Sequence, residues 1–353
     1  MTRFDLIVIG GGPAGSAAAI EAARQGMRVV LIDRTKPPIR RVCGEVLSFA
    51  GCELAAELSG IDWSTSPRFE WARFTDATRP GESVGWRPVR PSRGISRTRL
   101  DESLLGAAIK EGVQVRRGTR ARGWDRTSAG ELCVPLGEEE AIVAPRLVLA
   151  IGRRPAAGPD SWIGWREATR CLPVTGGPDL EIVLGEGESY FGRARIDDGT
   201  VTTTHLARHA ESVTPGFSGC LGTPRFHLGR ARVESAPGIF HVGDAMAAWP
   251  PIVGDGITAA LAGGARLGRR LADRNFDERG WRHDWQRHHG RALRSAMALH
   301  AILLRPALRR PLWRLARAWA GLAPLLEAQV KLASLSRPGV RAATKGRYIP
   351  AGS

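Results

Sequence analysis

Short apolar runs alternate with segments of helical character over the first 150 residues of the chain. The runs at 6–9, 28–32 and 147–150 are rich in β-branched residues, which predicts strands buried on both faces of a parallel sheet. Between them, the pattern predicts a helix over 16–25 that ends at Gly26, a helix from Ser96 to about Glu111, and a strand over 113–117. This alternation of strands and helices indicates an α/β domain.

The central part of the chain follows a period of two instead. Alternation between Trp162 and Leu206, with turns at Gly176-Gly177 and Asp198-Gly199, predicts an antiparallel sheet on the substrate side. Residues 60–95 are rich in Trp, Arg and Pro, have no helical period, and are expected to form a separate layer. The expected organisation is a discontinuous nucleotide-binding domain (1–60, 96–155 and 231–275), a substrate domain (61–95 and 156–230) and a helical C-terminal region (276–353).

The C-terminal region carries almost all of the net charge. It has 19 Lys and Arg against 5 Asp and Glu from Arg266 onward, whereas the first 265 residues have 32 against 30. Leu and Trp alternate with Arg from Met297 to Leu335, which predicts an amphipathic helical region broken at Pro306, Pro311 and Pro324. Two interpretations stay open: a helical cap with solvated arginines, or a surface that docks on an anionic membrane or an acidic carrier protein. Nothing in the sequence indicates nucleic-acid binding.

Composition excludes several other classes of protein. The five cysteines, Cys43, Cys52, Cys133, Cys171 and Cys220, are odd in number and lack CxxC pairing, so we expect reduced thiols and no zinc site. No histidine spacing indicates a metal, and no GxSxG motif indicates a serine hydrolase. There is no export signal and no apolar run of membrane-spanning length. A cytoplasmic enzyme, with possible peripheral membrane contact, is expected.

The glycine loop after the first predicted strand is the strongest chemical signal. Gly10, Gly12 and Gly15 form a GxGxxG pattern in which the first glycine makes the turn, the second admits a pyrophosphate and the third lets the helix pack closely. The helix N-terminus then faces the pyrophosphate. Asp33 follows the next strand, 18 residues after Gly15, where a carboxylate accepts hydrogen bonds from an adenosine ribose. The segment predicts a dinucleotide site that disfavours NADP.

A second motif changes the expected dinucleotide from NAD to FAD. A buried strand at 239–242 runs into Gly243-Asp244, which places a carboxylate where the ribityl chain of a flavin would lie. Pro251 to Ile257 then form a turn and start a helix whose amides can stabilise negative charge on the flavin pyrimidine as the ring is reduced.

At this point the chain resembles FAD-dependent oxidoreductases of the group that includes geranylgeranyl reductases and aromatic-ring monooxygenases. The resemblance covers about residues 4–275 and rests on the glycine loop with Asp33, on Ser96-Arg97 to Asp101, and on Gly243-Asp244 to Gly256. Residues 41–48, with Cys43-Gly44-Glu45, resemble the Cys-Gly-Glu segment of the geranylgeranyl-reductase-like branch. The fold that this resemblance implies is a Rossmann-like FAD domain interrupted by an antiparallel substrate domain and followed by helices.

The chain also departs from the aromatic hydroxylases of this group. Met246 follows Gly-Asp-Ala where those enzymes commonly have a histidine, and Ile151-Gly152 replaces their internal Asp-Gly. No second glycine fingerprint indicates a resident nicotinamide domain, so electrons are expected from a transient NAD(P)H, a separate reductase or the substrate.

These features give the following expected site. The resemblance places Cys43 beside the flavin, facing the substrate cavity, either as a proton donor or as an ordinary core residue. Glu45 is expected to bond either the flavin or a neighbouring loop, and Trp249 either to line the cavity or to pack as part of a lid. The residues expected to bind the cofactor are Gly10, Gly12, Pro13, Ala14, Gly15, Asp33, Arg34, Arg41, Gly44, Arg97, Gly152, Gly243, Asp244, Pro251, Gly254, Gly256 and Ile257.

Three functions follow as alternatives. The first is an FAD-dependent oxidoreductase that reduces or forms a carbon–carbon double bond in an apolar or aromatic metabolite. The second is a flavin monooxygenase that hydroxylates an aromatic or polyketide-like compound. The third is a non-catalytic flavoprotein that docks through its basic C-terminal region. The Cys-Gly-Glu segment and the missing histidine favour the first.

Overall fold

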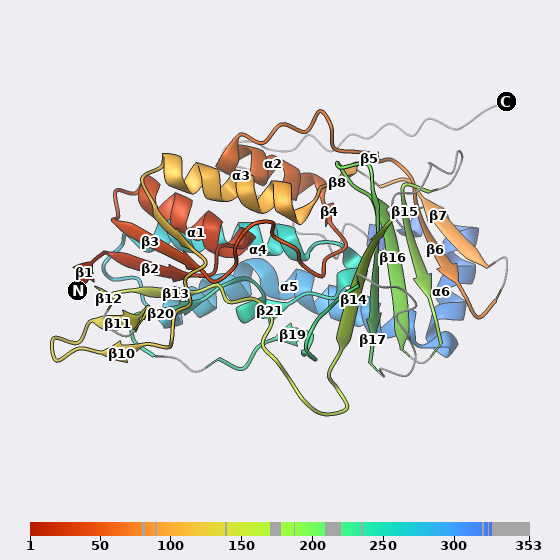
Figure 1. Ribbon diagram of the computed structural model, residues 1–353. Coiled ribbons are helices and arrows are strands. Elements are labelled where there is room, and N and C mark those ends of the chain that lie inside the picture. The colour runs from red at the N-terminus through yellow and green to blue at the C-terminus, as the bar shows by residue number, and fades with distance from the viewer. Residues whose placement is uncertain are drawn as a thin grey trace.

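The computed structural model describes residues 1–79, 82–88, 90–137, 140–169, 178–186, 188–208, 220–233, 236–319, 321–323 and 325–326. Within these ranges, a parallel sheet with helices on its faces lies at one end of the molecule and a larger, mostly antiparallel sheet at the other (Figure 1). The α/β fold expected from the sequence is confirmed. The expected turn at Gly176-Gly177, Cys171, Pro324 and the stretch from 327 onward lie outside the described residues.

The parallel sheet forms from the short apolar runs. Its order is β20 (Ile239–His241), β13 (Leu147–Leu149), β2 (Leu6–Ile9), β3 (Val29–Asp33) and β9 (Gln114–Arg117), and every neighbouring pair is parallel. Strands β2 and β3 are almost wholly buried, and their side chains are apolar on both faces up to Asp33 at the end of β3. Helix α1 (Pro13–Arg24) begins three residues earlier than expected, because Gly12 is its N-cap and Pro13 occupies its first turn. Helix α3 (Arg97–Lys110) has Ser96 as its N-cap.

Helices α1 and α4 (Gly256–Arg270) pack with their backbones in contact. A Cβ on Gly264 would lie 2.1 Å from the Ala14 carbonyl oxygen, and one on Gly268 would lie 2.5 Å from that of Ala18. Only glycine allows this separation, which also brings the first turns of both helices to the same region of the molecule.

The larger sheet has the order β18 (Leu221–Gly222), β14 (Ile163–Thr169), β17 (Val201–Ala207), β16 (Ser189–Arg195), β15 (Leu180–Leu184), β6 (Ala72–Asp76) and β7 (Ser83–Trp86). The predicted antiparallel pairing of 162–206 is confirmed for β14, β17, β16 and β15. Strand β15 is parallel to β6, which the sequence did not indicate. Strands β6 and β7 come from the segment 60–95 that is expected to lie apart from the nucleotide-binding domain, and they lie in this sheet with the strands of 162–206.

Shorter elements complete the fold. Strands β4 (Val46–Leu47), β8 (Ser92–Gly94) and β5 (Arg68–Phe69) pair beside α2 (Phe49–Ser59). A further sheet has the order β1 (Thr2–Arg3), β12 (Ala141–Ala144), β11 (Leu132–Pro135) and β10 (Asp125–Arg126). Strands β19 (Gly229–Arg230) and β21 (Ala247–Ala248) form a ribbon between the helical turns η2 (Gly243–Ala245) and η3 (Pro251–Val253) and the larger sheet.

The C-terminal region forms α5 (Glu278–Leu304), which runs behind the middle of the molecule, and α6 (Pro306–Ala318), which lies behind the larger sheet in Figure 1. The predicted break at Pro306 is confirmed, but the one at Pro311 is wrong. Pro311 lies inside α6 with an exposed ring, and packing of the same helix around Trp313 offsets the lost backbone hydrogen bond. Among the described helices, none combines the length and the hydropathy that a membrane span requires.

Candidate functional site

A cavity of about 950 Å³ extends from the glycine loop to the C-terminal helices. Of the residues expected to bind a cofactor, all but Gly15 line it, as do Cys43 and Trp249. Segments from 9–14, 40–46, 150–155, 242–244 and 249–257 therefore meet around one volume. Its size is within the range of ligand-binding pockets.

The glycine loop is shaped differently at its two later glycines. A Cβ on Gly15 would lie 1.9 Å from the Gly10 carbonyl oxygen, so Gly15 is needed for packing beneath the loop. A Cβ on Gly12 would point into the cavity, where the nearest atom is Nη2 of Arg97 at 3.7 Å. A bound group can therefore approach the Gly12 backbone closely, as a pyrophosphate does in this type of loop.

Two helix N-termini open into the same cavity. Neither Gly12 before α1 nor Asp255 before α4 provides a side-chain cap, and Pro13, Gly256 and Ile257 line the cavity. The positive ends of both helix dipoles thus face this volume. These two ends suit a pyrophosphate at α1 and the electron-rich pyrimidine of a reduced flavin at α4, so the residues present fit FAD.

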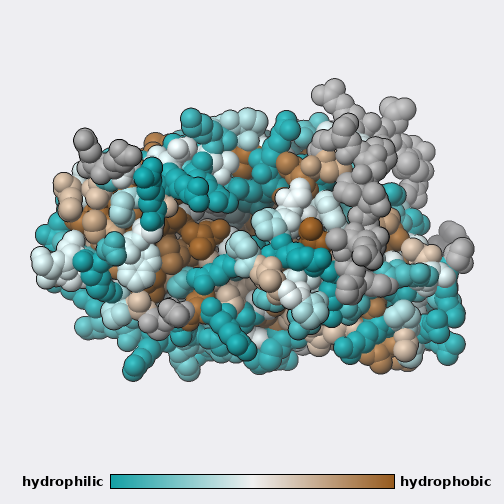
Figure 2. All heavy atoms as spheres, turned by 60° about the horizontal axis from the view of Figure 1, so that its bottom comes forward, coloured by the Kyte–Doolittle hydropathy of each residue, from teal (hydrophilic) through white to brown (hydrophobic). Residues whose placement is uncertain are grey.

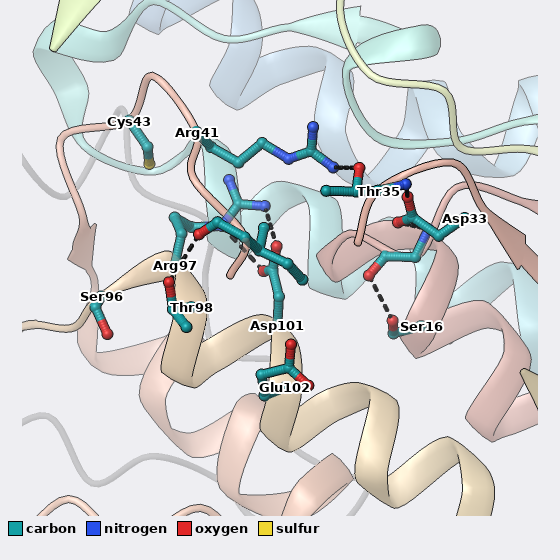
Figure 3. Close-up of polar contacts among 12 residues, drawn as sticks. Ser16, Asp33, Thr35, Arg41, Cys43, Ser96, Arg97, Thr98, Asp101 and Glu102 are labelled. Carbon is teal, nitrogen blue, oxygen red and sulfur yellow. Dashed lines mark hydrogen bonds and ion pairs between the residues drawn. The ribbon is translucent and has the colours of Figure 1, made fainter. Parts of the chain in front are cut away.

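Asp33 at the end of β3 is buried and holds the glycine loop. Its Oδ2 accepts a hydrogen bond of 2.8 Å from the Gly11 amide, and its Oδ1 accepts one of 2.7 Å from the Thr35 amide (Figure 3). Because each carboxylate oxygen has a second lone pair, acceptance from a ribose hydroxyl stays a prediction. Arg41 donates to the Thr35 hydroxyl at 2.8 Å, and Arg34 is exposed at the cavity rim.

Arginines surround the polar half of the cavity. Arg153 donates a 3.1 Å hydrogen bond to Asp244 and lies 4.5 Å from the centroid of the Phe226 ring. The other arginines that line the cavity are Arg34, Arg40, Arg41, Arg97, Arg120, Arg154 and Arg225, against three acidic residues, Asp33, Glu45 and Asp244. This excess of positive charge favours an anionic ligand.

Cys43 and Arg97 face each other across the loop that leads to β4 (Figure 3). Arg97 makes a two-pronged ion pair with Asp101, with distances of 3.0 and 2.8 Å, and also interacts with the Cys43 thiol. Burial lowers the pKa of Arg97, but Asp101 and Cys43 raise it by more. The Cys43 Sγ in turn accepts a 3.4 Å contact from the Glu45 amide. The thiol is therefore held between a fixed cation and an amide.

Glu45 bonds neighbouring elements of the protein. Its Oε1 accepts from the Arg97 amide at the start of α3 (2.9 Å), and its Oε2 accepts from Arg166 on β14 (2.5 Å). Burial raises the pKa of Glu45, while Arg166 and the Arg97 amide lower it in part. The backbone of Glu45 is left-handed, with φ of 56°, which for a non-glycine residue indicates a conformation imposed by its surroundings.

The other half of the cavity is apolar. It lies against the larger sheet and the last helices, and Trp249 and Tyr190 also line the cavity. The Tyr190 hydroxyl accepts from the Ile252 amide at 3.1 Å, and burial raises the pKa of that hydroxyl. Residues of the apolar half are Phe69, Ala72, Phe74, Val84, Trp86, Leu180, Ile182, Ala194, Leu206, Leu299, Leu303, Leu312, Trp313 and Ala316.

The sequence did not indicate which arginines bond Asp244 and Glu45, or which residues form the apolar wall of the cavity. Arg153 and Arg166 lie in segments without a motif, and only the fold brings them to Asp244 and Glu45. The apolar wall combines residues from β6, β15, β16 and α6. The period of two in β16 indicated a half-buried strand, but no pattern indicated what its buried face would enclose.

Comparisons with known proteins find similarity to FAD-dependent oxidoreductases. A family model described as FAD dependent oxidoreductase matches residues 5–37. A menaquinone reductase from Mycolicibacterium smegmatis is 25% identical, with 86% of each chain covered. A digeranylgeranylglycerophospholipid reductase from Methanothermobacter thermautotrophicus is 27% identical, with 77% of this chain and 78% of that protein covered.

Solved structures share the fold along nearly the whole chain. A geranylgeranyl bacteriochlorophyll reductase-like protein from Thermoplasma acidophilum superposes with a TM-score of 0.67 at 18% identity, covering 94% of this chain and 93% of its own. A variant of the flavin-dependent brominase Bmp2 gives a TM-score of 0.72 at 15% identity, covering 92% and 97%.

Fold, site and similarity together define the class: the chain is an FAD-dependent oxidoreductase. Within that class it resembles the group of geranylgeranyl reductases and flavin monooxygenases, as expected from its motifs.

Proposed function

We propose that this oxidoreductase reduces a carbon–carbon double bond in a lipid-like substrate, such as the polyprenyl chain of a quinone or a glycerolipid. The observation that carries the proposal is the apolar half of the cavity, which continues from Cys43 and Trp249 to the inner side of α6. A long hydrocarbon chain would find apolar partners along this length. The two reductases that align over most of the chain have names that refer to lipids of this kind, which supports the same conclusion.

The residues of the chain have separable roles in this reaction. FAD, when bound and reduced, would supply a hydride equivalent to one carbon of the double bond. Cys43 would donate the proton from Sγ to the other carbon and recover a proton from solvent. Arg97 and Glu45 position that thiol, because each contacts it directly. Trp249 and Tyr190, both buried, exclude water from the reacting atoms.

The electron donor is a separate part of the proposal. We propose that NAD(P)H or a reductase reduces the flavin transiently from outside the cavity. A nicotinamide-binding domain within the chain would need a second glycine motif, which the sequence lacks.

An anaerobic half-reaction tests the proposal. The FAD-loaded protein is reduced with dithionite and mixed without oxygen with menaquinone or with a geranylgeranyl lipid, while flavin absorbance is followed. We expect reoxidation by at least one of these compounds and a product that still carries two additional hydrogens by mass spectrometry after exposure to air, which returns a reduced quinone ring to the quinone but leaves a saturated prenyl unit unchanged. Failure to reoxidise with polyprenyl compounds, together with gain of one oxygen atom by an aromatic compound in air, would establish the hydroxylation alternative instead.

Two variants separate chemistry from substrate binding. Cys43→Ser should slow reoxidation strongly and leave FAD content unchanged. Gly192 lies in the cavity wall, and a Cβ there would meet only the Glu181 carbonyl oxygen, at 3.8 Å. The side chain of Gly192→Ile should therefore fit without disturbing the fold, occupy part of the cavity and weaken binding of the lipid substrate. If Cys43→Ser keeps the wild-type rate, the thiol is not the proton donor.

A further inference from the structure

Helix α6 has an inner side that closes the cavity. Leu312, Trp313 and Ala316 line the apolar half, and the Trp313 ring lies 6.1 Å from that of Phe74 on β6. Beside them Arg309, only 1% exposed, donates a 2.8 Å hydrogen bond to the buried carboxylate of Asp76. Because breaking a buried ion pair is costly, α6 is held firmly in one orientation against the larger sheet.

The outer side of the same helix exposes large apolar residues. Leu308 is 46% exposed, Leu315 59% and Trp319 55%. The spacing of seven residues places Leu308 and Leu315 along one side of α6, and Trp319 directly follows the helix as its C-cap. In Figure 2 apolar side chains interrupt a mostly hydrophilic surface, including at the end of the molecule where α6 lies. These apolar side chains contribute no burial to stability as long as they face water.

Arginines follow a different side of α6, with Arg310 about 140–160° and Arg314 about 100–120° around the helix from Leu308 and Leu315. Arg305, Arg310 and Arg314 are exposed, and none has an ion-pair or hydrogen-bond partner for its side chain among the residues described. Exposed apolar residues on one side of a helix, with unpaired cations further round it, are what a helix presents when it lies in the plane of a membrane surface. An acidic protein surface would match the charge of the arginines, but acidic side chains would not bury Leu308, Leu315 and Trp319.

We propose that α6 docks on the surface of an anionic lipid bilayer, with Leu308, Leu315 and Trp319 in the headgroup region, Arg314 on lipid phosphates, and Arg310 attracted to the same negative surface from further round the helix. Docking does not depend on the catalytic reaction. If the proposed function also holds, the helix that closes the apolar cavity is the one that contacts the bilayer, so a lipid substrate would have a short path between them.

Vesicle cosedimentation of the full-length, FAD-loaded protein tests docking without any turnover. Vesicles of phosphatidylcholine alone are compared with vesicles that also contain phosphatidylglycerol, at low and high salt. We expect binding only to the anionic vesicles, weakened by salt. Arg310→Gln with Arg314→Gln should reduce the affinity about 30-fold, because each cation near an anionic surface contributes about 1 kcal/mol.

Matched variants make the result specific to α6. Leu315→Ser with Trp319→Ser should also release the protein from vesicles. Arg279→Gln with Arg294→Gln on α5 removes the same charge from exposed positions, and Ile109→Ser removes an exposed apolar residue of α3; both should bind as the wild type does. The proposal is overturned if wild type prefers neither vesicle, or if the α5 pair weakens binding equally. A dimer in solution that Leu315→Ser with Trp319→Ser converts to monomer would show that a second copy covers these apolar residues instead.

Discussion

The polar and apolar halves of the cavity are built in different ways. In the polar half, backbone shape decides the geometry: Gly12 leaves space, Gly15 permits packing, and two uncapped helices point inward. In the apolar half, side chains from strands and helices distant in sequence create the volume, and Arg309 with Asp76 holds the last wall in place. The first half is sensitive to single atoms added to the backbone, and the second to loss of anchoring contacts.

Gly15→Ala should have the largest effect of all. The added Cβ would meet the Gly10 carbonyl oxygen at 1.9 Å, so the loop or α1 must move, and we expect a loss of more than about 3 kcal/mol in the free energy of unfolding together with loss of FAD. Urea unfolding and flavin absorbance measure both. The control is Gly106→Ala in α3, where no atom lies within 4 Å, and where stability should rise by about 0.5–1 kcal/mol. Equal losses in both variants would contradict the packing role of Gly15.

Arg309→Leu comes next and acts on the apolar half. Removing the cation leaves Asp76 buried without its charge partner, which should cost about 3–5 kcal/mol. Adding Asp76→Asn should restore part of that stability. Arg79→Leu, which breaks an exposed ion pair with Glu82, should change it by less than about 1 kcal/mol. Urea unfolding followed by tryptophan fluorescence compares the three, and no recovery in the double variant would argue against the ion pair as the anchor.

Gly12→Ala separates binding from folding within the polar half. Its Cβ would enter open cavity space, so the apoprotein should keep its melting temperature. FAD would then meet the new methyl group, and its affinity should fall about ten- to a hundredfold. Fluorescence titration of apoprotein with FAD measures the change. Unchanged affinity would mean that the pyrophosphate lies elsewhere.

The smallest expected effect is the contribution of His300, near the apolar half, to the pH dependence of stability. Burial lowers the pKa of His300, which packs on Trp162, to about 4, below the value of about 6.5 in an unfolded chain. Between these values the unfolded state binds the proton more readily, so this contribution to stability falls as pH drops from about 6.5 to 4.

We therefore expect a melting temperature that declines over this pH range, and a shallower decline in His300→Phe. His283→Gln, at an exposed position, serves as the control and should follow the wild type. Identical curves for His300→Phe and the wild type would assign the pH dependence to other groups.

The two halves also differ in how far the sequence could predict them. Gly10 to Gly15 and Asp33 follow one another along the chain, so their spacing alone indicates a loop with a ligand. Gly243 to Gly256 likewise carry their own signal. The sequence placed these segments around one site because each ends a strand or starts a helix of a known arrangement.

The apolar half escaped prediction because its contacts are non-local. Nothing near Phe74 indicates that β6 pairs in parallel with β15 or that α6 covers it. Pro311 does not end α6, because a local rule about proline does not include the packing of Trp313. The sequence does not decide whether Glu45 contacts the flavin or the protein, and its bond to Arg166, 121 positions away, has no sequence signal.

The contacts of Glu45 have a consequence for movement within the molecule. One carboxylate oxygen accepts from α3 beside the nucleotide half, and the other from β14 in the larger sheet. Any opening of the cavity that separates these two elements must therefore break one of the two bonds, and the segment with Cys43 would follow whichever bond remains. A spectroscopic label at Cys43 is therefore expected to report separation of α3 from β14.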